Sequence, residues 1–298
     1  MENRNAIVSF VEGSRPDDHV KIEPQPVDDD PEGSLAPSPS PSPRASDRLP
    51  LVSCICPTYN RPPSHQHLLE EAIESFLRQD YPNKELIVIN DCPGQELVCD
   101  APGVRVVNVP ERFPTLGEKR NAGVRLSRGE LIAPWDDDDI SLPWRLSLSV
   151  ARLGDAAYFN ARRYWFLDGA GLHGDHAMGV GHKCSLFTRA AFEAVGGYPT
   201  SSGAEDMEMD AALVTRMPRV LDVLSGDAEL MRREWFYIYR WGVSPSHLTA
   251  RVPHDAFYRE LATWPVQPGR FELHPRWQQD YAADTHALLE APEVAEAR

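Results

Sequence analysis

The stretch Leu51-Val52-Ser53-Cys54-Ile55-Cys56 is the first of several short apolar runs separated by segments of helical character. Similar runs follow at 86–89, 104–109 and 131–135. Between the first two runs, residues 69–77 carry apolar side chains at the spacing of one helix face. Short apolar strands that alternate with amphipathic helices are typical of βα units. The sequence therefore predicts an α/β fold with a mostly parallel sheet flanked by helices.

The first 49 residues have a different composition from the rest of the chain. They contain ten acidic and five basic residues, an acidic run at 28–30, and prolines that alternate with small residues at 37–43. Such a segment buries too little apolar surface to fold alone and favours solvated, partly polyproline-II conformations. We expect residues 1–49 to form a disordered tail.

Overall composition excludes several classes of protein. The 298 residues carry a net charge of -15 at pH 7, which disfavours a surface that wraps nucleic acid. The sequence shows neither a membrane span nor a signal-peptide core, so we expect a cytoplasmic protein without integral membrane association. The five cysteines form no CxxC pair, and we interpret them as free thiols rather than as a zinc or redox site.

Four consecutive carboxylates, Asp136 to Asp139, directly follow the apolar run at 131–135. Adjacent carboxylates repel one another, and a divalent cation would relieve that repulsion. In an extended chain Asp136 and Asp138 point to the same side, and oxygen ligands favour Mg²⁺ or Mn²⁺. The alternative is a solvated acidic run, with Asp139 serving the turn into the next helix. Ligands of open α/β sheets gather at the carboxyl ends of strands, which favours the metal site.

The first two predicted strands also end in polar residues. The first ends in Pro57-Thr58-Tyr59-Asn60-Arg61 and the second in Asn90-Asp91. A carboxylate beside such a turn can bind the edge of a base or a ribose, although ordinary turn chemistry explains each stretch equally well.

Thr115 and Glu118 fit a capping box that opens a helix running to about residue 126. Lys119 and Arg120 then lie near the helix N-terminus, where the helix dipole disfavours cations. A bound diphosphate would compensate for this placement. A surface pair is the alternative.

Glu205 and Asp206 lie at the start of a later predicted helix. Either carboxylate could accept a proton from a hydroxyl nucleophile, while helix capping by Asp206 is the alternative. His247 is a candidate metal or phosphate ligand, although a lone histidine is more often structural.

Four segments in this order, together with the Asp run that follows them, resemble the nucleotide-sugar-binding half of the inverting glycosyltransferase family two, of GT-A fold. The segments are 52–61, 86–91, 117–123 and 129–132. Downstream, Gly196-Gly197-Tyr198-Pro199 and Glu205-Asp206 match the acceptor side of the family pattern. The resemblance covers about residues 51–216 and implies a Rossmann-like mostly parallel sheet.

The resemblance also implies roles for individual residues. The nucleotide-sugar-binding set would be Pro57, Thr58, Asn60, Asp91, Lys119, Arg120, Asp136 and Asp137. Within that set, Asp91 would read the nucleobase edge and Asp136 would approach the ribose. Asp138 would coordinate Mn²⁺ or Mg²⁺ on the diphosphate, with His247 as a further ligand. Asp206 would be the general base, and Glu205 would orient the acceptor.

The resemblance implies a metal-dependent, inverting transfer of a sugar from a nucleotide-diphosphate donor, most simply a UDP-sugar, to a hydroxyl of a discrete acceptor. A glycan, a lipid, a protein and a modified nucleobase all stay open as acceptors. The second strand ends in Asn90-Asp91-Cys92-Pro93, where the family usually has Asp-Asp-Gly-Ser, which leaves the base open. The additional Asp137 leaves open which carboxylates hold the metal.

The predicted organisation has three parts. Residues 1–49 form the tail, and residues 50–252 form the glycosyltransferase domain, with a nucleotide-sugar half at 50–140 and an acceptor half at 141–252. Residues 253–298 form an extension packed on that domain. Two other functions fit parts of the sequence: a nucleotidyltransferase with a similar α/β core, and a non-catalytic binding or scaffold protein that keeps the fold.

Overall fold

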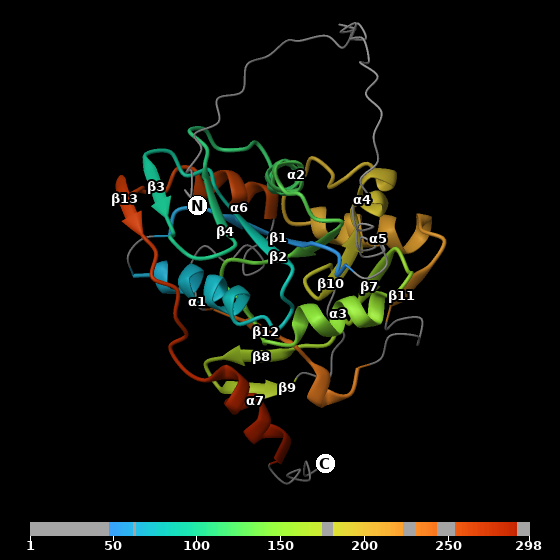
Figure 1. Ribbon diagram of the computed structural model, residues 1–298. Helices are drawn as coiled ribbons and strands as arrows, with labels where there is room; N and C mark the ends of the chain where they lie inside the picture. The colour runs from blue at the N-terminus through green and yellow to red at the C-terminus, as the bar shows by residue number, and fades with distance from the viewer. Residues whose placement is uncertain (1–47, 62–63, 175–180, 223–229, 243–253, 291–298) are drawn as a thin grey trace, which may run out of the picture. The chain divides into compact units, whose positions relative to one another are not determined.

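A seven-stranded sheet with the order β11-β7-β10-β5-β1-β2-β4 forms the centre of the described part of the chain (Figure 1). The structure is a computed structural model that describes residues 48–61, 64–174, 181–222, 230–242 and 254–290. The sheet consists of β1 (Val52–Thr58), β2 (Lys84–Asn90), β4 (Val104–Asn108), β5 (Leu131–Pro134), β7 (Tyr158–Asn160), β10 (Ser185–Thr188) and β11 (Val220–Asp222). Strand β10 runs antiparallel to β5 and β7, and the other pairs are parallel. The predicted mostly parallel α/β sheet is confirmed.

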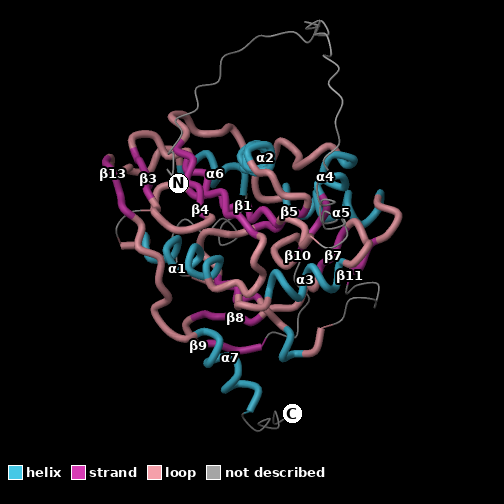
Figure 2. Tube along the Cα trace, viewed as in Figure 1, coloured by secondary structure: helices cyan, strands magenta, loops and turns pink. Residues whose placement is uncertain are grey.

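Helices pack on both faces of this sheet (Figure 2). They are α1 (Gln66–Leu77), α2 (Leu116–Leu126), α3 (Arg145–Leu153), α4 (Arg189–Val195) and α5 (Glu205–Arg216). Alternate residues of β1 face opposite sides, because side chains along a strand have a period of two. Cys54 and Cys56 join the core that contains Phe76 of α1, whereas Ile55 joins the core that contains Val124 of α2. Burial on both faces explains the continuous apolar runs in the sequence.

The start of α2 follows the predicted capping pattern. The backbone N–H of Glu118 donates to Thr115 Oγ1 at 3.2 Å, and the Thr115 hydroxyl donates to Glu118 Oε2 at 2.9 Å. Helix α5 begins differently, since its N-cap residue is Ala204, without a side-chain hydrogen bond. Asp206 is therefore not the N-cap residue, although its carboxylate accepts a hydrogen bond from the Met207 backbone N–H in the first turn of α5.

Two smaller sheets and the C-terminal helices complete the described elements. One sheet has the order β6-β12-β8-β9, and the other pairs β13 with β3. Their strands are β3 (Gln95–Val98), β6 (Ile140–Ser141), β8 (Trp165–Asp168), β9 (Gly171–Gly174), β12 (Tyr237–Arg240) and β13 (Gly269–Glu272), and the remaining helices are α6 (His254–Leu261) and α7 (Tyr281–Glu290). In the described residues, no helix combines the length and the apolar character that crossing a bilayer requires.

Candidate active site

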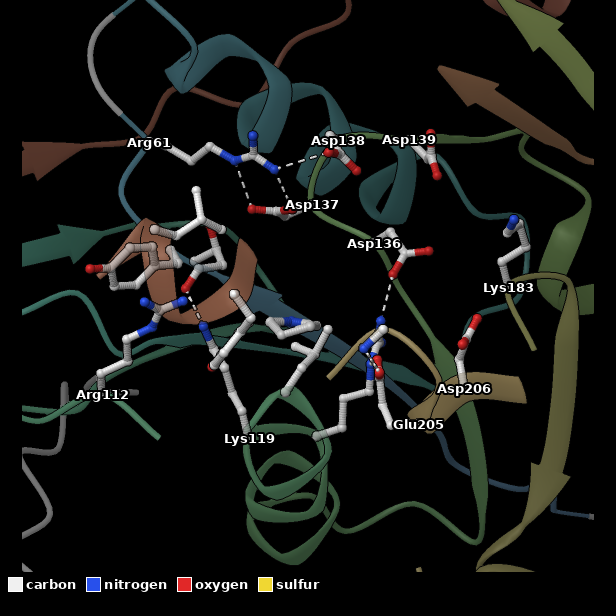
Figure 3. A pocket seen from close by; sticks show the side chains of 18 of the residues that line it. Arg61, Arg112, Lys119, Asp136, Asp137, Asp138, Asp139, Lys183, Glu205 and Asp206 are labelled. Atoms are coloured by element: carbon white, nitrogen blue, oxygen red, sulfur yellow. Dashed lines mark hydrogen bonds and ion pairs between the residues drawn. The ribbon is translucent and has the colours of Figure 1, made fainter. Parts of the chain in front are cut away.

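A pocket lies where β1 and β5 end and where α2 and α5 begin (Figure 3). The Asp run lies along the top of the view, Arg112 and Lys119 at the lower left, and Glu205 and Asp206 at the lower right. Most of the residues singled out in the sequence line this pocket: Pro57, Thr58, Lys119, Arg120, Asp136, Asp137, Asp138, Glu205 and Asp206. The fold thus brings carboxylates from segments about 70 residues apart to one cavity.

Arg61 forms ion pairs with two carboxylates of the Asp run. Its guanidinium donates to Asp137 from Nε at 2.8 Å and from an Nη atom at 2.5 Å, and it also contacts Asp138 at 3.2 Å. The Arg61 side chain is 6% exposed, so this pairing takes place largely out of water. A guanidinium therefore supplies part of the charge compensation that the sequence had suggested for a metal ion.

The outer pair of the Asp run is held by the hydroxyl of Tyr237. This hydroxyl lies 3.0 Å from Asp136 Oδ2 and 2.7 Å from Asp139 Oδ2. Burial and the neighbouring carboxylates raise the pKa of Asp139 well above its ordinary value. Burial also acts to raise the pKa of Asp136, but the Arg120 guanidinium outweighs it and brings the pKa down to about 2.

Lys119 and Asp91 form a buried ion pair beside the pocket. Lys119 Nζ lies 2.5 Å from Asp91 Oδ1, and it also donates to the Thr58 carbonyl oxygen. The backbone N–H of Phe113 donates to the second Asp91 oxygen at 3.0 Å. Asp91 is fully buried and does not line the pocket, whereas Lys119 does.

Asn60 also lies outside the pocket lining, because its amide donates to the carbonyl oxygen of Pro265 at 3.2 Å. Its backbone has a φ of 46°, in the left-handed region that asparagine tolerates better than most residues. Of the predicted nucleotide-sugar-binding set, Asn60 and Asp91 are thus the two residues that do not line the pocket.

Arg120 connects the Asp run to the start of α5. Its guanidinium lies 3.1 Å from Asp136 Oδ1 and 3.4 Å from Glu205 Oε1. Glu205 also accepts a hydrogen bond from the backbone N–H of Gly203 at 2.5 Å. Protein carboxylates therefore compensate Arg120 at the N-terminus of α2, the place where the sequence had suggested a diphosphate.

Asp206 is one of the carboxylates in the pocket whose pKa is raised by burial, together with Glu205 and Asp139. Burial raises the pKa of Asp206 above the ordinary value, while Arg120 and Lys183 act in the opposite direction. Its oxygen Oδ1 accepts a hydrogen bond from the backbone N–H of Met207 at 2.8 Å. A partly desolvated carboxylate that faces a cavity can accept a proton from a bound hydroxyl.

Several lining residues carry no sequence motif that would have identified them. Lys183 lies over the ring of Tyr239 at 4.3 Å, and Arg112 lies between two tyrosine rings. Tyr258 enters the pocket from α6, in the region where the sequence shows no strong periodicity. Tyr237 and Tyr239 belong to β12, and nothing local in the sequence shows that this strand borders the Asp run.

The side chains fit a metal ion only if the substrate supplies most of its ligands. Among the described residues, no group of three or more His, Cys, Asp or Glu side chains could hold a metal. Asp138 lines the pocket, and His247 lies outside the described residues. Mg²⁺ in many enzymes is bound through one or two carboxylates together with substrate phosphates and water. Asp138 could supply one such carboxylate ligand, with the substrate phosphates and water supplying the others.

Comparisons with known proteins match the part of the chain that supplies most of the residues lining this pocket. The model of a family described as glycosyl transferase family 2 matches residues 53–196. A protein named as a colanic acid biosynthesis glycosyl transferase, WcaA of Escherichia coli, is 37% identical over 108 residues, which cover 34% of this chain and 37% of WcaA. The succinoglycan biosynthesis protein ExoO of Rhizobium meliloti is 34% identical over 121 residues, covering 39% of this chain and 33% of ExoO. The chain thus matches only about a third of the length of these relatives.

Solved structures with a related arrangement include TarS 1–349 of S. aureus, with a TM-score of 0.47 and 16% identity over 64% of this chain and 60% of that one. Another is the mannosyltransferase PcManGT from Pyrobaculum calidifontis, solved with GDP-Man and Mn²⁺. It has a TM-score of 0.43 and 21% identity, with coverage of 59% of this chain and 55% of that one.

Proposed function

We propose, from the match of residues 53–196 to the glycosyl transferase family 2 model, that the protein transfers a sugar from a nucleoside-diphosphate donor to a hydroxyl group of a discrete acceptor. The observation that carries the proposal is the presence of Asp138 and Asp206 in one pocket, although 68 residues separate them. The transfer needs a group that stabilises the leaving diphosphate and a base that activates the acceptor. These two carboxylates supply candidates for both roles.

We propose that Asp206 accepts the proton of the acceptor hydroxyl as that oxygen attacks the anomeric carbon. The new bond forms between the acceptor oxygen and the anomeric carbon, and the bond between that carbon and the diphosphate oxygen breaks. Attack from the face opposite the diphosphate inverts the configuration. Glu205, held by Arg120 and by the Gly203 N–H, would orient the acceptor beside Asp206.

The donor would lie along the wall formed by β1, the start of α2 and the Asp run. Pro57 and Thr58 would line the base, Lys119 and Arg120 would contact the nucleotide, and Asp136 would approach the ribose. A Mn²⁺ or Mg²⁺ ion held by Asp138, with Asp137 nearby and His247 as a candidate further ligand, would stabilise negative charge on the diphosphate. Because Arg61 already contacts Asp138, its guanidinium would remain beside this group and limit the negative charge around it.

Calorimetry with a panel of UDP-, GDP- and ADP-sugars tests the donor assignment. We expect at least one nucleotide sugar to bind when Mn²⁺ or Mg²⁺ is present and to bind more weakly in EDTA. Asp138→Asn should remove the effect of the metal, whereas Asp100→Asn, at an exposed aspartate outside the pocket, should retain it. Failure of every donor to bind the wild-type protein with either metal would contradict the proposal.

A further inference from the structure

The carboxylate of Asp206 packs against the backbone of Gly181. Gly181 has a φ of 77°, in the left-handed region that glycine adopts without strain. A Cβ atom added to Gly181 would overlap Oδ2 of Asp206 and would lie 3.0 Å from its Cγ. Among the described residues, the three heavy atoms nearest to that position all belong to Asp206. Glycine at position 181 therefore leaves the space that the carboxylate occupies.

Asn160 holds the Gly181 backbone at this contact. It is the last residue of β7 and is 0% exposed. Its Nδ2 donates to the Gly181 carbonyl oxygen at 3.0 Å. Its Oδ1 accepts from the backbone N–H of Arg162 at 3.1 Å, which fixes the plane of the amide. A buried amide that is bonded at both ends leaves the Gly181 backbone little freedom to move.

The Asn160 side chain is also bonded to α5, the helix that carries Asp206. Its Nδ2 donates to the Tyr158 hydroxyl at 2.8 Å, and that hydroxyl donates to Asp210 of α5. Asp210 lies one helical turn after Asp206. Arg162 forms an ion pair with Asp210 at 2.7 Å, in which the two side chains are 5% and 9% exposed. Asn160 thus connects the backbone that touches the carboxylate to the helix that carries it.

These contacts restrict the direction of the Asp206 carboxylate without placing a charge against it. Oδ1 accepts from the Met207 N–H at 2.8 Å, and Gly181 packs against Oδ2. A cation in the place of Gly181 would stabilise the charged carboxylate and weaken it as a base, whereas a neutral backbone contact limits its motion and excludes water. A general base must lie within hydrogen-bond distance of the proton that it accepts, so its orientation affects the rate.

We propose that Gly181 positions the Asp206 carboxylate for proton transfer and that Asn160 holds Gly181 in place for this. Both are positioning residues, because they act through Asp206 and neither lines the pocket. The inference rests on the proposed role of Asp206 as the general base. It goes beyond that role by assigning the residues that determine where the base points.

The first test is Gly181→Ala. The new methyl group meets the short Asp206 side chain rather than another part of the backbone, so we expect a folded protein with a displaced carboxylate. The assay uses Mn²⁺ and the nucleotide sugar that binds most tightly among UDP-, GDP- and ADP-sugars. The kcat for release of nucleoside diphosphate should fall about 10–100-fold. The Kd of the same donor, measured by calorimetry, should change by less than about twofold.

Gly242→Ala is the matched control for backbone strain. Gly242 has a φ of 74°, close to that of Gly181, and no described atom lies within 4 Å of a Cβ atom added to it. The control variant therefore carries similar strain without touching the proposed base. Its kcat and donor Kd should both stay close to the wild-type values, and its Tm should decrease about as much as that of Gly181→Ala.

A double-mutant cycle separates positioning from a general structural role. In an Asp206→Asn background, Gly181→Ala should lower kcat by less than about twofold, because the displaced group no longer accepts a proton. Asn160→Ala should also lower kcat in the wild-type background and lose this effect in the Asp206→Asn background. Thermal unfolding and the donor Kd report whether the Asn160 variant is folded, and the Gly181 cycle tests the inference independently of it.

The outcomes distinguish this inference from the proposed function. Wild-type kcat in Gly181→Ala, or an equal loss of kcat in both backgrounds, would overturn the inference alone, provided that Asp206→Asn itself lowers kcat. If Asp206→Asn releases nucleoside diphosphate at the wild-type rate, or if the wild-type protein binds no nucleotide sugar, the proposed function and the inference both fail.

Discussion

Single arginine and lysine residues allow this chain to concentrate carboxylates at one pocket. Arg61, Lys119 and Arg120 each bind at least one carboxylate, and each is less than 10% exposed. Buried charges are tolerated only when they are paired, because desolvation otherwise outweighs their attraction. The unusual sequence of four adjacent aspartates is thus accommodated by Arg61, which follows β1, and by Arg120 of α2, in addition to any bound metal.

The raised pKa of Asp206 leads to a prediction for the pH dependence of transfer. Burial and the Asp136 carboxylate disfavour its charged form, and Arg120 and Lys183 favour it, with a net pKa above 3.8. The neighbouring Glu205 carboxylate also has a pKa raised by burial. A general base works when deprotonated, so kcat/KM should fall as the pH decreases through this raised pKa.

A pH profile of kcat/KM tests this directly, and Asp206→Asn is the reference that should lose the acidic limb. An acidic limb at or below the ordinary aspartate pKa of 3.8 would contradict the assigned environment of Asp206.

Residue types in the sequence identified nine of the 19 residues that line the pocket, because four adjacent acids after a strand and bases at the start of a helix are unusual. Their pairing could not be predicted in the same way. The Arg61 contact with Asp137 joins residues 76 positions apart, and no local pattern specifies it. The place of Arg112 in the pocket was equally unpredictable, because it depends on contacts with Tyr59, which follows β1, and with Tyr258 of α6.

At the scale of elements, the position of α2 determines where Lys119 and Arg120 reach the pocket. The helix begins against the segment around Pro199, and a Cβ atom added at Gly117 would lie 1.8 Å from the Pro199 carbonyl oxygen. The backbone N–H of Gly117 also donates to the Ser201 carbonyl oxygen at 3.1 Å. Only glycine permits this approach, which explains its place in the motif before Glu118.

We therefore expect Gly117→Ala to push α2 away from the Pro199 segment and to destabilise the protein by about 1–3 kcal/mol. Urea unfolding should show a lower midpoint with an unchanged m-value. Arg125→Ala, on the exposed face of the same helix, should stay within about 0.5 kcal/mol of the wild type. Equal stability of Gly117→Ala and the wild type would show that the close approach is not required.

Elements with local signals were predictable, and elements that depend on distant partners were not. The Thr115 cap and the apolar face of α1 are encoded within a few residues each. Strand β13 has exposed and half-exposed side chains and forms because it pairs with β3, more than 170 residues earlier. The sequence pattern alone therefore left the region after about residue 253 without assigned strands.

At the scale of the whole molecule, Glu71 of α1 joins three distant parts of the chain. Its carboxylate lies 2.5 Å from an Arg240 Nη atom of β12, with both side chains at most 3% exposed. It also accepts hydrogen bonds from the Gln278 backbone N–H at 2.9 Å and from the Tyr281 hydroxyl at 2.8 Å. This buried carboxylate thus ties the C-terminal segment to α1, together with hydrogen bonds from the His274 N–H to Glu70 and from Trp277 Nε1 to Ser75.

Replacing this carboxylate by an amide should be strongly destabilising, because Arg240 would remain buried without its ionic partner. We expect Glu71→Gln to lower the free energy of unfolding by about 3–5 kcal/mol. Glu74→Gln removes an ion pair with the half-exposed Arg78 on the same helix and should cost at most about 0.5 kcal/mol. Similar losses for the two variants, measured by urea unfolding, would be inconsistent with the special role of Glu71.

The most direct test of the account is the rate at which Asp206→Asn releases nucleoside diphosphate from the sugar donor that the wild-type protein binds. With Mn²⁺ and saturating donor, the loss of a general base should lower kcat by about 10²–10⁴-fold. The Kd of the donor should stay close to the wild-type value. The control is Glu208→Gln, which changes an exposed acid on the same helix and should leave both kcat and this Kd close to the wild-type values. Release at the wild-type rate by Asp206→Asn would contradict the central claim that this carboxylate activates the attacking hydroxyl.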